Sequence, residues 1–335
     1  MRFLTFEWLL RRAGAAVVGS LLTTLLVASS ASAWNASGHM QVALIAYRKM
    51  TPAARTKAVE LLRKHPRFAE DFEEKKPDDL TGPEQERKWF FAHAATWADI
   101  ARKQRAFHRE LWHYINEPIF LSEADREFFE ANGVPNNVSR KLVSGSDENE
   151  LNVVQAIALA KKKLSAGSTS QSDRALYLTW LMHLVGDVHQ PLHAVSFYSK
   201  RRFPSGDKGG NDILITGKRS LHSTWDGFLG TSESVSYLDT KVADYLKDPK
   251  LKQAADDAAS ALSVDDWVDE SYDLAFDFAY DAAIVAVAEQ VESSGSKAKP
   301  STYLPQSYFT EGKEHSKRRA VQAGYRLAAL LQKLL

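Results

Sequence analysis

One segment of fourteen residues, Trp180 to His193, constrains this chain more than any other. It reads WLMHLVGDVHQPLH and places three histidines and an aspartate close together. His183 and Asp187 are four residues apart, so a helix would present one imidazole and one carboxylate on the same face. Pro191 would kink or end that helix, which lets His193 turn toward a second site. The segment therefore predicts a helix that carries metal ligands and then breaks.

A second segment, His222-Ser-Thr-Trp-Asp226, repeats the His–Asp spacing. Imidazole and carboxylate groups together suit Zn²⁺, whose ligand bonds are about 2.0–2.2 Å long. A lone helical histidine is usually a packed or surface side chain. Two His–Asp pairs and the offset His193 meet the spacing of metal ligands jointly, so they predict a zinc site that holds more than one ion.

The first 33 residues differ from the rest of the chain. Three arginines precede a run of small and apolar residues over positions 13–29, and Ala31-Ser-Ala33 follows. This order of basic, apolar and A-x-A segments predicts a secretory signal that is removed after Ala33. An N-terminal membrane anchor is the alternative, but the run is short and contains two glycines. We expect an exported protein, either periplasmic or secreted.

The charge balance of the chain limits how it can recognise a polyanion. Removal of the three arginines and one glutamate of the first 33 residues changes the formal net charge from +1 to about −1. A near-neutral protein does not bind nucleic acid through a general basic field, so any such specificity must come from the site itself. The chain has no cysteine, which excludes disulfides and thiolate ligands. Histidine and carboxylate ligands remain, and they are consistent with zinc.

Apolar residues at helical spacing run through most of the chain. They predict helices over residues 39–50, 52–64, 95–106, 150–164, 172–190, 238–247, 264–292 and 314–335. One strand, over residues 213–216, follows a glycine-rich turn cluster and indicates a short β-hairpin. Neither a repeat nor a dividing linker occurs in residues 34–335, so we expect one mainly α domain there, with metal sites built from facing helices.

Further candidate ligands lie nearer the N-terminus. Cleavage after Ala33 would leave Trp34 as the first residue, five positions before His39. A free α-amino group, with a pKa of about 7.7–8.0, can lose its proton and bind zinc together with the carbonyl of the same residue. Two tryptophan-containing segments, residues 96–102 and 111–116, add Asp99 and His113.

These motifs, in this order, resemble the zinc-dependent single-strand-specific nucleases of fungi and plants, the type I nucleases, which share a superfamily with bacterial zinc phospholipase C. The resemblance runs from Trp34 to residues 323–330 and so covers essentially the whole chain after the expected signal. It implies the helical phospholipase C/nuclease fold and three zinc ions per chain. The implied ligands are Asp99, His113, His183 and Asp187 for the first zinc, His193, His222 and Asp226 for the second, and Trp34, His39 and the bridging Asp187 for the third.

Two features favour the nuclease branch over the phospholipase branch. His39 follows Trp34 closely, and Asp226 stands where phospholipase C typically carries Glu. The resemblance thus implies hydrolysis of phosphodiesters in RNA and single-stranded DNA to 5′-phosphate products, and it leaves a 3′-nucleotidase activity open. Two alternatives remain: a zinc-dependent phospholipase C, although no basic amphipathic helix stands out, and a non-catalytic exported zinc-binding protein.

The resemblance also suggests where the substrate is held. Gly209-Gly210-Asn211 matches a motif implicated in holding a base near the cluster, and Tyr114 falls where an aromatic side chain stacks on a base. Tyr114 and Asn116 replace the Phe and Asp of the fungal members, so no base preference is implied. The alternative for Tyr114 is a core aromatic. We expect single-stranded DNA and RNA as partners, with neither a stable membrane association nor a protein partner.

Two residues are predicted to act on the reaction directly. Asp99 is expected to orient a water molecule and accept its proton. Arg102, one helical turn further on, is expected to hold a phosphate oxygen and the charge of the transition state. The alternative for Arg102 is a solvated side chain, since Lys103 and Arg105 are its neighbours. His189 matches a position that is not a ligand, where a supporting role to a ligand or the substrate is the alternative to simple packing.

Overall fold

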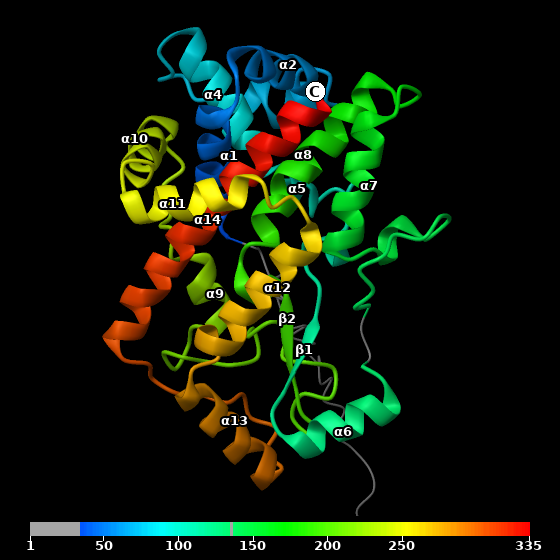
Figure 1. Ribbon diagram of the computed structural model, residues 1–335, viewed down its shortest axis with the longest axis vertical. Coiled ribbons are helices and arrows are strands. Elements are labelled where there is room, and N and C mark those ends of the chain that lie inside the picture. The colour runs from blue at the N-terminus through cyan, green and yellow to red at the C-terminus, as the bar shows by residue number, and fades with distance from the viewer. Residues whose placement is uncertain (1–33, 135–136) are drawn as a thin grey trace, which may run out of the picture. The chain divides into compact units, whose positions relative to one another are not determined.

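α-Helices make up most of the described chain, as the helical spacing of its apolar residues predicts. The computed structural model describes residues 34–134 and 137–335, which belong to one unit (Figure 1). The expected signal sequence and its cleavage point after Ala33 lie outside the described residues. Among the residues described, no helix is both long enough and apolar enough to span a membrane.

The described helices and strands follow one another along the chain with short connections. The α-helices are α1 Ala36–Lys49, α2 Pro52–Leu62, α3 Phe68–Asp71, α4 Gly82–Ala94, α5 Trp97–Ala101, α6 Glu123–Asn132, α7 Val153–Ser165, α8 Gln171–Asp187, α9 Leu221–Asp226, α10 Val235–Tyr245, α11 Pro249–Ala259, α12 Val264–Leu274, α13 Ala282–Ser294 and α14 Gln306–Leu334. The 3-10 helices are η1 Glu73–Lys75, η2 Glu110–His113, η3 Glu148–Glu150 and η4 Pro191–His193, a π-helical segment η5 covers Ala275–Ala279, and the strands are β1 Glu117–Phe120 and β2 Val195–Tyr198.

α8 lies at the centre of the helical packing. It contacts α1, α2, α4, α5, α7 and α14, and every residue from Tyr177 to Asp187 is buried. A helix that is apolar all round is buried on all sides, and α8 has apolar residues on every face. The predicted metal-ligand helix is therefore a core element, whose polar side chains must find partners inside the protein.

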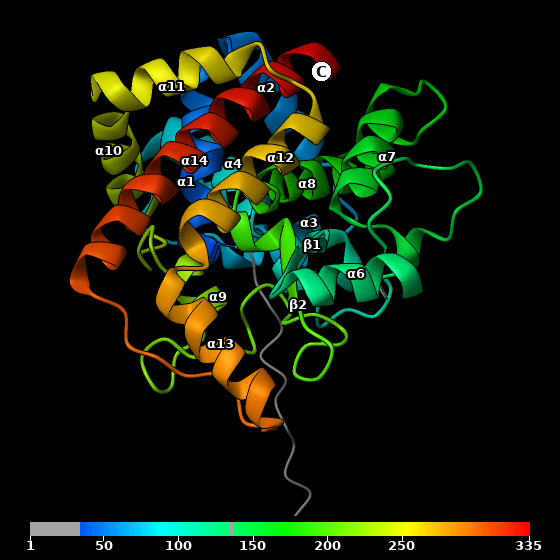
Figure 2. The ribbon, with the colours of Figure 1, turned by 60° about the horizontal axis from the view of Figure 1, so that its bottom comes forward.

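α14 runs across α1 and α11, and both views show this crossing (Figures 1 and 2). At the crossing, a Cβ atom added to Gly324 would lie 2.4 Å from Cγ2 of Ile45. Only a glycine allows the two helices to approach this closely. The last helix of the chain thus supports α1, the helix that carries His39.

The only sheet in the described residues is a pair of short parallel strands, β1 and β2, in register from Glu117 opposite Val195. β1 follows the segment that ends η2 at His113, and β2 follows η4, which ends at His193. The pairing begins with Ile115 N–H, which donates to His193 O over 2.9 Å. The sheet therefore brings two predicted ligands together from positions eighty residues apart.

Several predicted elements are wrong in extent or type. Residues 213–216 form isolated bridges, with Ser220, Ser301 and Tyr303 as partners, and do not form a strand. The predicted helix over 264–292 breaks after η5, because buried Tyr280 leaves the helix to donate to Asp207, and Asp281 caps a new helix. The predicted helix over 95–106 ends at Ala101.

Candidate metal centre

The first group of predicted ligands surrounds Asp187 at the end of α8. His183 Nε2 and His39 Nε2 each lie 3.3 Å from Asp187 Oδ1, and His113 Nδ1 lies 3.0 Å from Asp187 Oδ2. His39 comes from α1 and stacks on His183 with ring centroids 3.9 Å apart. All four side chains are almost fully buried. The two oxygens of Asp187 thus face different histidines, a suitable arrangement for a bridging carboxylate.

Asp99 and Arg102 lie at the solvent side of this group. Asp99 Oδ1 is 4.0 Å from His183 Nε2 and 2.9 Å from Arg102 Nη2, and both side chains remain partly exposed, at 21% and 14%. They belong to the short helix α5 and its C-cap, whose position depends on Asp71. The carboxylate of Asp71 accepts hydrogen bonds from Trp97 Nε1 at 2.9 Å and from Gln104 Nε2 at 3.0 Å. Solvent can therefore approach the group from the side of α5.

His193, His222 and Asp226 form a second group. His193 Nε2 lies 3.1 Å from His222 Nε2, and His222 Nε2 lies 3.6 Å from Asp226 Oδ2. Pro191 begins the 3-10 turn η4 that presents His193, and the six residues of α9 place His222 and Asp226 on one face. The break after α8 therefore creates a second group, as the position of Pro191 predicts.

Backbone carbonyls fix the orientation of three of these imidazoles. Nδ1 of His183 donates to Ala95 O at 2.7 Å, Nδ1 of His193 to His113 O at 2.6 Å, and Nδ1 of His222 to Gly209 O at 2.7 Å. A carbonyl only accepts hydrogen bonds, so each ring carries its proton on Nδ1 and directs the lone pair of Nε2 inward. This is the usual arrangement of histidines that bind a metal.

The electrostatics of the described residues call for a cation at both groups. Buried atoms without a hydrogen-bond partner include both ring nitrogens of His39, Nε2 of His113, Oδ1 of Asp99 and Oδ1 of Asp187. Burial lowers the pKa of His39 to about 4, and burial raises the pKa of Asp187 and of Asp226 well above the ordinary range of a carboxyl. Neutral imidazoles and uncompensated carboxylates in a buried site are ready to bind a divalent metal.

The ligand atoms gather into three sets that fit such an ion. The atoms of each set lie within 4.8 Å of one another, and the sets are His39 with His183 and Asp187, Asp99 with His113 and His183, and His193 with His222 and Asp226. All donors are nitrogen or oxygen, which suits zinc. The donor chemistry and the unpartnered buried atoms together fit the metal cluster that the sequence predicts.

Trp34 is buried at the start of the described chain, beside the residues of both groups. Its Cβ would lie 2.4 Å from a Cβ added to Gly38, which precedes His39. Asn35 N–H donates to Asp226 O at 3.3 Å and so fixes the next residue along the chain. The bond between Ala33 and Trp34, whose cleavage would free the amino group, lies outside the described residues.

The predicted substrate residues occupy two segments next to the ligands. Tyr114 and Asn116 are partly exposed and flank Ile115, whose N–H binds His193 O. Gly210 and Asn211 lie in a loop with positive φ angles at residues 206 and 208–210, and the carbonyl of Gly209 in this loop holds His222. The side-chain amide of Asn211 donates to Lys208 O at 2.9 Å, within the loop.

Sequence reasoning missed three supporting residues, Gln190, Asp71 and Asp207. Gln190 lies between two predicted ligands in a buried segment, a position that requires hydrogen-bond partners and was therefore open to detection. Asp71 and Asp207 lie in segments without any comparable signal. His189 points away from the ligands: its Nε2 accepts from Arg326 at 2.8 Å and its Nδ1 donates to Val185 O.

Comparison with known proteins agrees with this geometry. The model of the S1/P1 nuclease family matches residues 34–335. The chain is also similar to three proteins of Arabidopsis thaliana, endonuclease 2 (28% identical over 231 residues, 67% of this chain and 66% of the relative), endonuclease 5 (27% over 180 residues, 51% and 56%) and endonuclease 4 (28% over 166 residues, 47% and 50%). The chain thus spans between half and just under two thirds of the lengths of these relatives. The match across residues 34–335 shows that the chain belongs to the S1/P1 nuclease family.

Proposed function

We propose that this protein is a zinc-dependent endonuclease that hydrolyses the phosphodiester bonds of RNA and single-stranded DNA and leaves 5′-phosphate ends. The observation that carries the proposal is the position of Asp187, whose Oδ1 faces His39 and His183 while Oδ2 faces His113. A carboxylate with this exposure to two sets of ligands can join two metal ions, as hydrolysis by paired metals requires.

Three zinc ions are assigned to three sets of ligands. The sets are Asp99, His113, His183 and Asp187 for the first ion, His193, His222 and Asp226 for the second, and Trp34, His39 and Asp187 for the third. Zinc supplies Lewis-acid chemistry when bound: it makes water acidic near neutral pH and stabilises negative charge on a phosphate. The third set needs a free amino group on Trp34, so it depends on cleavage after Ala33.

Asp99 and Arg102 serve the reaction from the solvent side. The carboxylate of Asp99 orients the attacking water and accepts its proton, because it is partly exposed and lies beside the ligand nitrogen of His183. Arg102, paired with Asp99 at 2.9 Å, presents its remaining N–H groups to a phosphate oxygen and stabilises the charge that develops there.

The substrate base is held by Tyr114 and by the glycine loop. Tyr114 stacks on a base, and Asn116, Gly210 and Asn211 contact its edge. A Cβ at Gly209 would lie 2.2 Å from Leu192 O, so the loop can approach the second group only with glycine there. A base must leave its stack to reach these groups, which costs a few kcal/mol in a duplex and little in a single strand. This difference favours single-stranded substrates.

Export of the protein is part of the proposal. The basic, apolar and A-x-A segments of residues 1–33 are those of a cleaved signal, and the family match begins at Trp34, the first residue after the predicted cleavage point. The mature enzyme is then periplasmic or secreted, and N-terminal sequencing of the purified protein tests whether Trp34 is its first residue.

The test combines metal content with activity on the mature protein. Zinc per chain is counted by elemental analysis, and hydrolysis of matched single-stranded and duplex oligonucleotides is followed before and after treatment with EDTA. We expect three zinc ions, faster cleavage of single strands, 5′-phosphate ends, and activity that returns when zinc is restored. Bound zinc with cleavage only of phospholipids would replace the nuclease by a phospholipase C, and a protein without zinc would overturn the proposal.

A further inference from the structure

Gln190 connects the two groups of ligands. Its backbone N–H donates to Asp187 O at 2.9 Å, and its backbone carbonyl accepts from His193 N–H at 3.0 Å. Its side-chain Nε2 donates to Asp226 Oδ1 at 2.8 Å. One fully buried residue therefore contacts a ligand of the first group and two ligands of the second.

The hydrogen bond from Gln190 decides which oxygen of Asp226 is available. Oδ1 is occupied by the amide of Gln190, and the other oxygen, Oδ2, faces His222 Nε2 at 3.6 Å. Gln190 cannot rotate freely, because its Oε1 accepts from Leu192 N–H at 2.6 Å. The amide is thus fixed at both ends, with its donor aimed at the carboxylate.

The turn that contains Gln190 is held from behind by α12 and α14. Ser271 Oγ donates to Val188 O at 2.6 Å, and Arg319 Nε donates to His189 O at 3.3 Å. Arg319 also donates to Ser271 Oγ at 2.8 Å, so the two contacts support each other. The backbone just before Gln190 is therefore anchored to two helices that supply none of the ligands.

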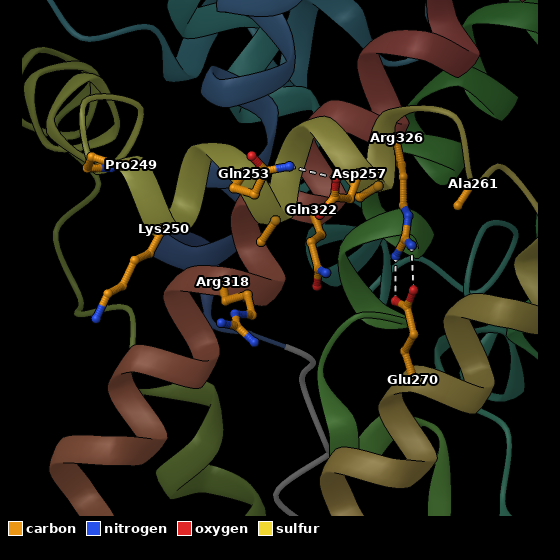
Figure 3. Close-up of a pocket in the computed structure, with 11 residues that line it drawn as sticks. Pro249, Lys250, Gln253, Asp257, Ala261, Glu270, Arg318, Gln322 and Arg326 are labelled. Atoms are coloured by element: carbon orange, nitrogen blue, oxygen red, sulfur yellow. Dashed lines mark hydrogen bonds and ion pairs between the residues drawn. The ribbon is translucent and has the colours of Figure 1, made fainter.

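His189 adds a side-chain contact to this support. Arg326 Nη1 donates to His189 Nε2 at 2.8 Å, and Nη2 of Arg326 pairs with Glu270 Oε1 at 2.6 Å. Figure 3 shows Arg326 and Glu270 facing each other in a surface pocket of about 610 Å³ between α11, α12 and α14. Glu270 offsets the charge of the two buried arginines, as a buried cation requires.

We propose that Gln190 is a positioning residue for the second zinc, which orients Asp226 toward His222 and His193 and depends on Ser271 and Arg319 to hold its turn in place. The proposal rests on the zinc-binding function proposed above. Hydrogen-bonded neighbours of metal ligands set ligand orientation, and their loss typically lowers metal affinity by about 10–100-fold. The effect is confined to one ion, because only Asp226 receives the side-chain hydrogen bond.

The test is a zinc titration of the metal-free protein, in which the affinity of each site is measured by calorimetry or by competition with a chelator. Gln190→Met keeps the approximate volume of the side chain and removes its hydrogen bonds. We expect one of three sites to weaken by about 10–100-fold and the other two to keep their affinities. Unchanged affinities at all three sites, or equal losses at all three, would overturn the proposal.

Gln155→Met is the matched control. Gln155 is also a buried glutamine whose Oε1 accepts from a backbone N–H, that of Asn152, and whose Nε2 donates to an oxygen, that of Lys141. It contacts no candidate ligand among the described residues, so it should lower the melting temperature of the metal-free protein without changing any zinc affinity. A wild-type protein that binds no zinc would instead refute the proposed function, which separates the two failures.

Ser271→Ala keeps the proposal testable if Gln190→Met does not fold. It removes a single hydroxyl group that bears on Val188 O and leaves Gln190 intact. We expect a smaller loss of affinity at the same single site. Affinities at all three sites that equal those of the wild type would overturn the dependence of Gln190 on this anchor.

Discussion

The backbone carbonyl of His113 accepts a hydrogen bond from Nδ1 of His193 over 2.6 Å. His113 belongs to the group of ligands around Asp187 and His193 to the group around Asp226, so this bond joins the two groups directly. It also commits the proton of His193 to Nδ1 and leaves Nε2 facing His222. The pairing of β1 with β2 begins immediately afterwards and keeps the two segments aligned. The two groups are therefore parts of one rigid centre.

Asp187→Asn is expected to remove more than one zinc ion per chain. An amide has one neutral oxygen, so it cannot serve His39, His183 and His113 together as the two carboxylate oxygens do. Activity should fall by more than about 100-fold, the upper end for loss of a group that merely supports a ligand. Elemental analysis and oligonucleotide hydrolysis measure both effects. Asp125→Asn, at another buried aspartate, should keep its zinc; zinc loss in both variants would point to general unfolding.

Arg102→Lys is expected to lower kcat by about 10²–10³-fold and to leave the zinc content unchanged. Lysine keeps the charge but lacks the planar fork that can pair with Asp99 and a phosphate together. Single-turnover kinetics with a short single-stranded oligonucleotide measure the change. Arg105→Lys, at an exposed position on the same segment, should behave as wild type. An unchanged kcat in Arg102→Lys would return Arg102 to the solvated side chain of the alternative interpretation.

Tyr114→Ala is expected to raise KM by about 5–150-fold, because stacking on a base contributes about 1–3 kcal/mol. Tyr114→Phe keeps the stacking ring and should retain the wild-type KM. Steady-state kinetics on single-stranded DNA and RNA make the comparison. A normal KM in Tyr114→Ala, together with a lower melting temperature, would identify Tyr114 as a core aromatic.

Gly324→Ala is expected to lower the free energy of unfolding by about 1–3 kcal/mol through overpacking against α1. The new methyl group would lie 2.4 Å from Cγ2 of Ile45 and 3.0 Å from the carbonyl of Val42, so α1 and α14 must move apart. Urea unfolding of the metal-free protein measures the loss. Gly167→Ala, where nothing lies within 4 Å of the added Cβ, provides the neutral control. Equal stability of the two variants would show that the crossing is not close-packed.

Glu270→Gln is expected to reduce stability at neutral pH and to lose this effect in acid. Burial opposes ionisation of Glu270, but the hydrogen bonds and charges of Arg326 and Arg319 outweigh it and lower the pKa of the carboxyl from 4.5 to about 2. A depressed carboxyl pKa stabilises the fold fully above pH 4.5, and this stabilisation disappears as pH falls toward 2. The difference in unfolding free energy between wild type and variant should therefore narrow between pH 5 and pH 3. Glu233→Gln, at an exposed position, should show no such trend.

The local part of the site could be predicted from the sequence because helical spacing fixes it. His183 with Asp187, and His222 with Asp226, lie on single faces of α8 and α9, and Pro191 ends the first helix before His193. The meeting of these groups with His39 and His113 was implied by the resemblance to a family rather than by spacing, since it depends on helices far apart in the chain.

The missed features depend on partners that no local pattern reveals. Arg319 reaches the backbone of His189 across 130 residues, and Tyr280 breaks a predicted helix in order to bind Asp207. β2 is buried along its whole length, so it lacks the alternation by which strands are recognised, and β1 contains a proline. Tertiary contacts decided each of these local conformations.

The crossing of α14 over α1 has a consequence for the order of synthesis. α1 carries His39 and is made first, yet the helix that covers it is the last part of the described chain to leave the ribosome. Contacts between distant ends of a chain form late, because the intervening loop must close before they contribute stability. A nascent chain therefore cannot assemble the whole cluster while it is still growing. Its final helix acts as a completion check that withholds the metal centre from truncated products.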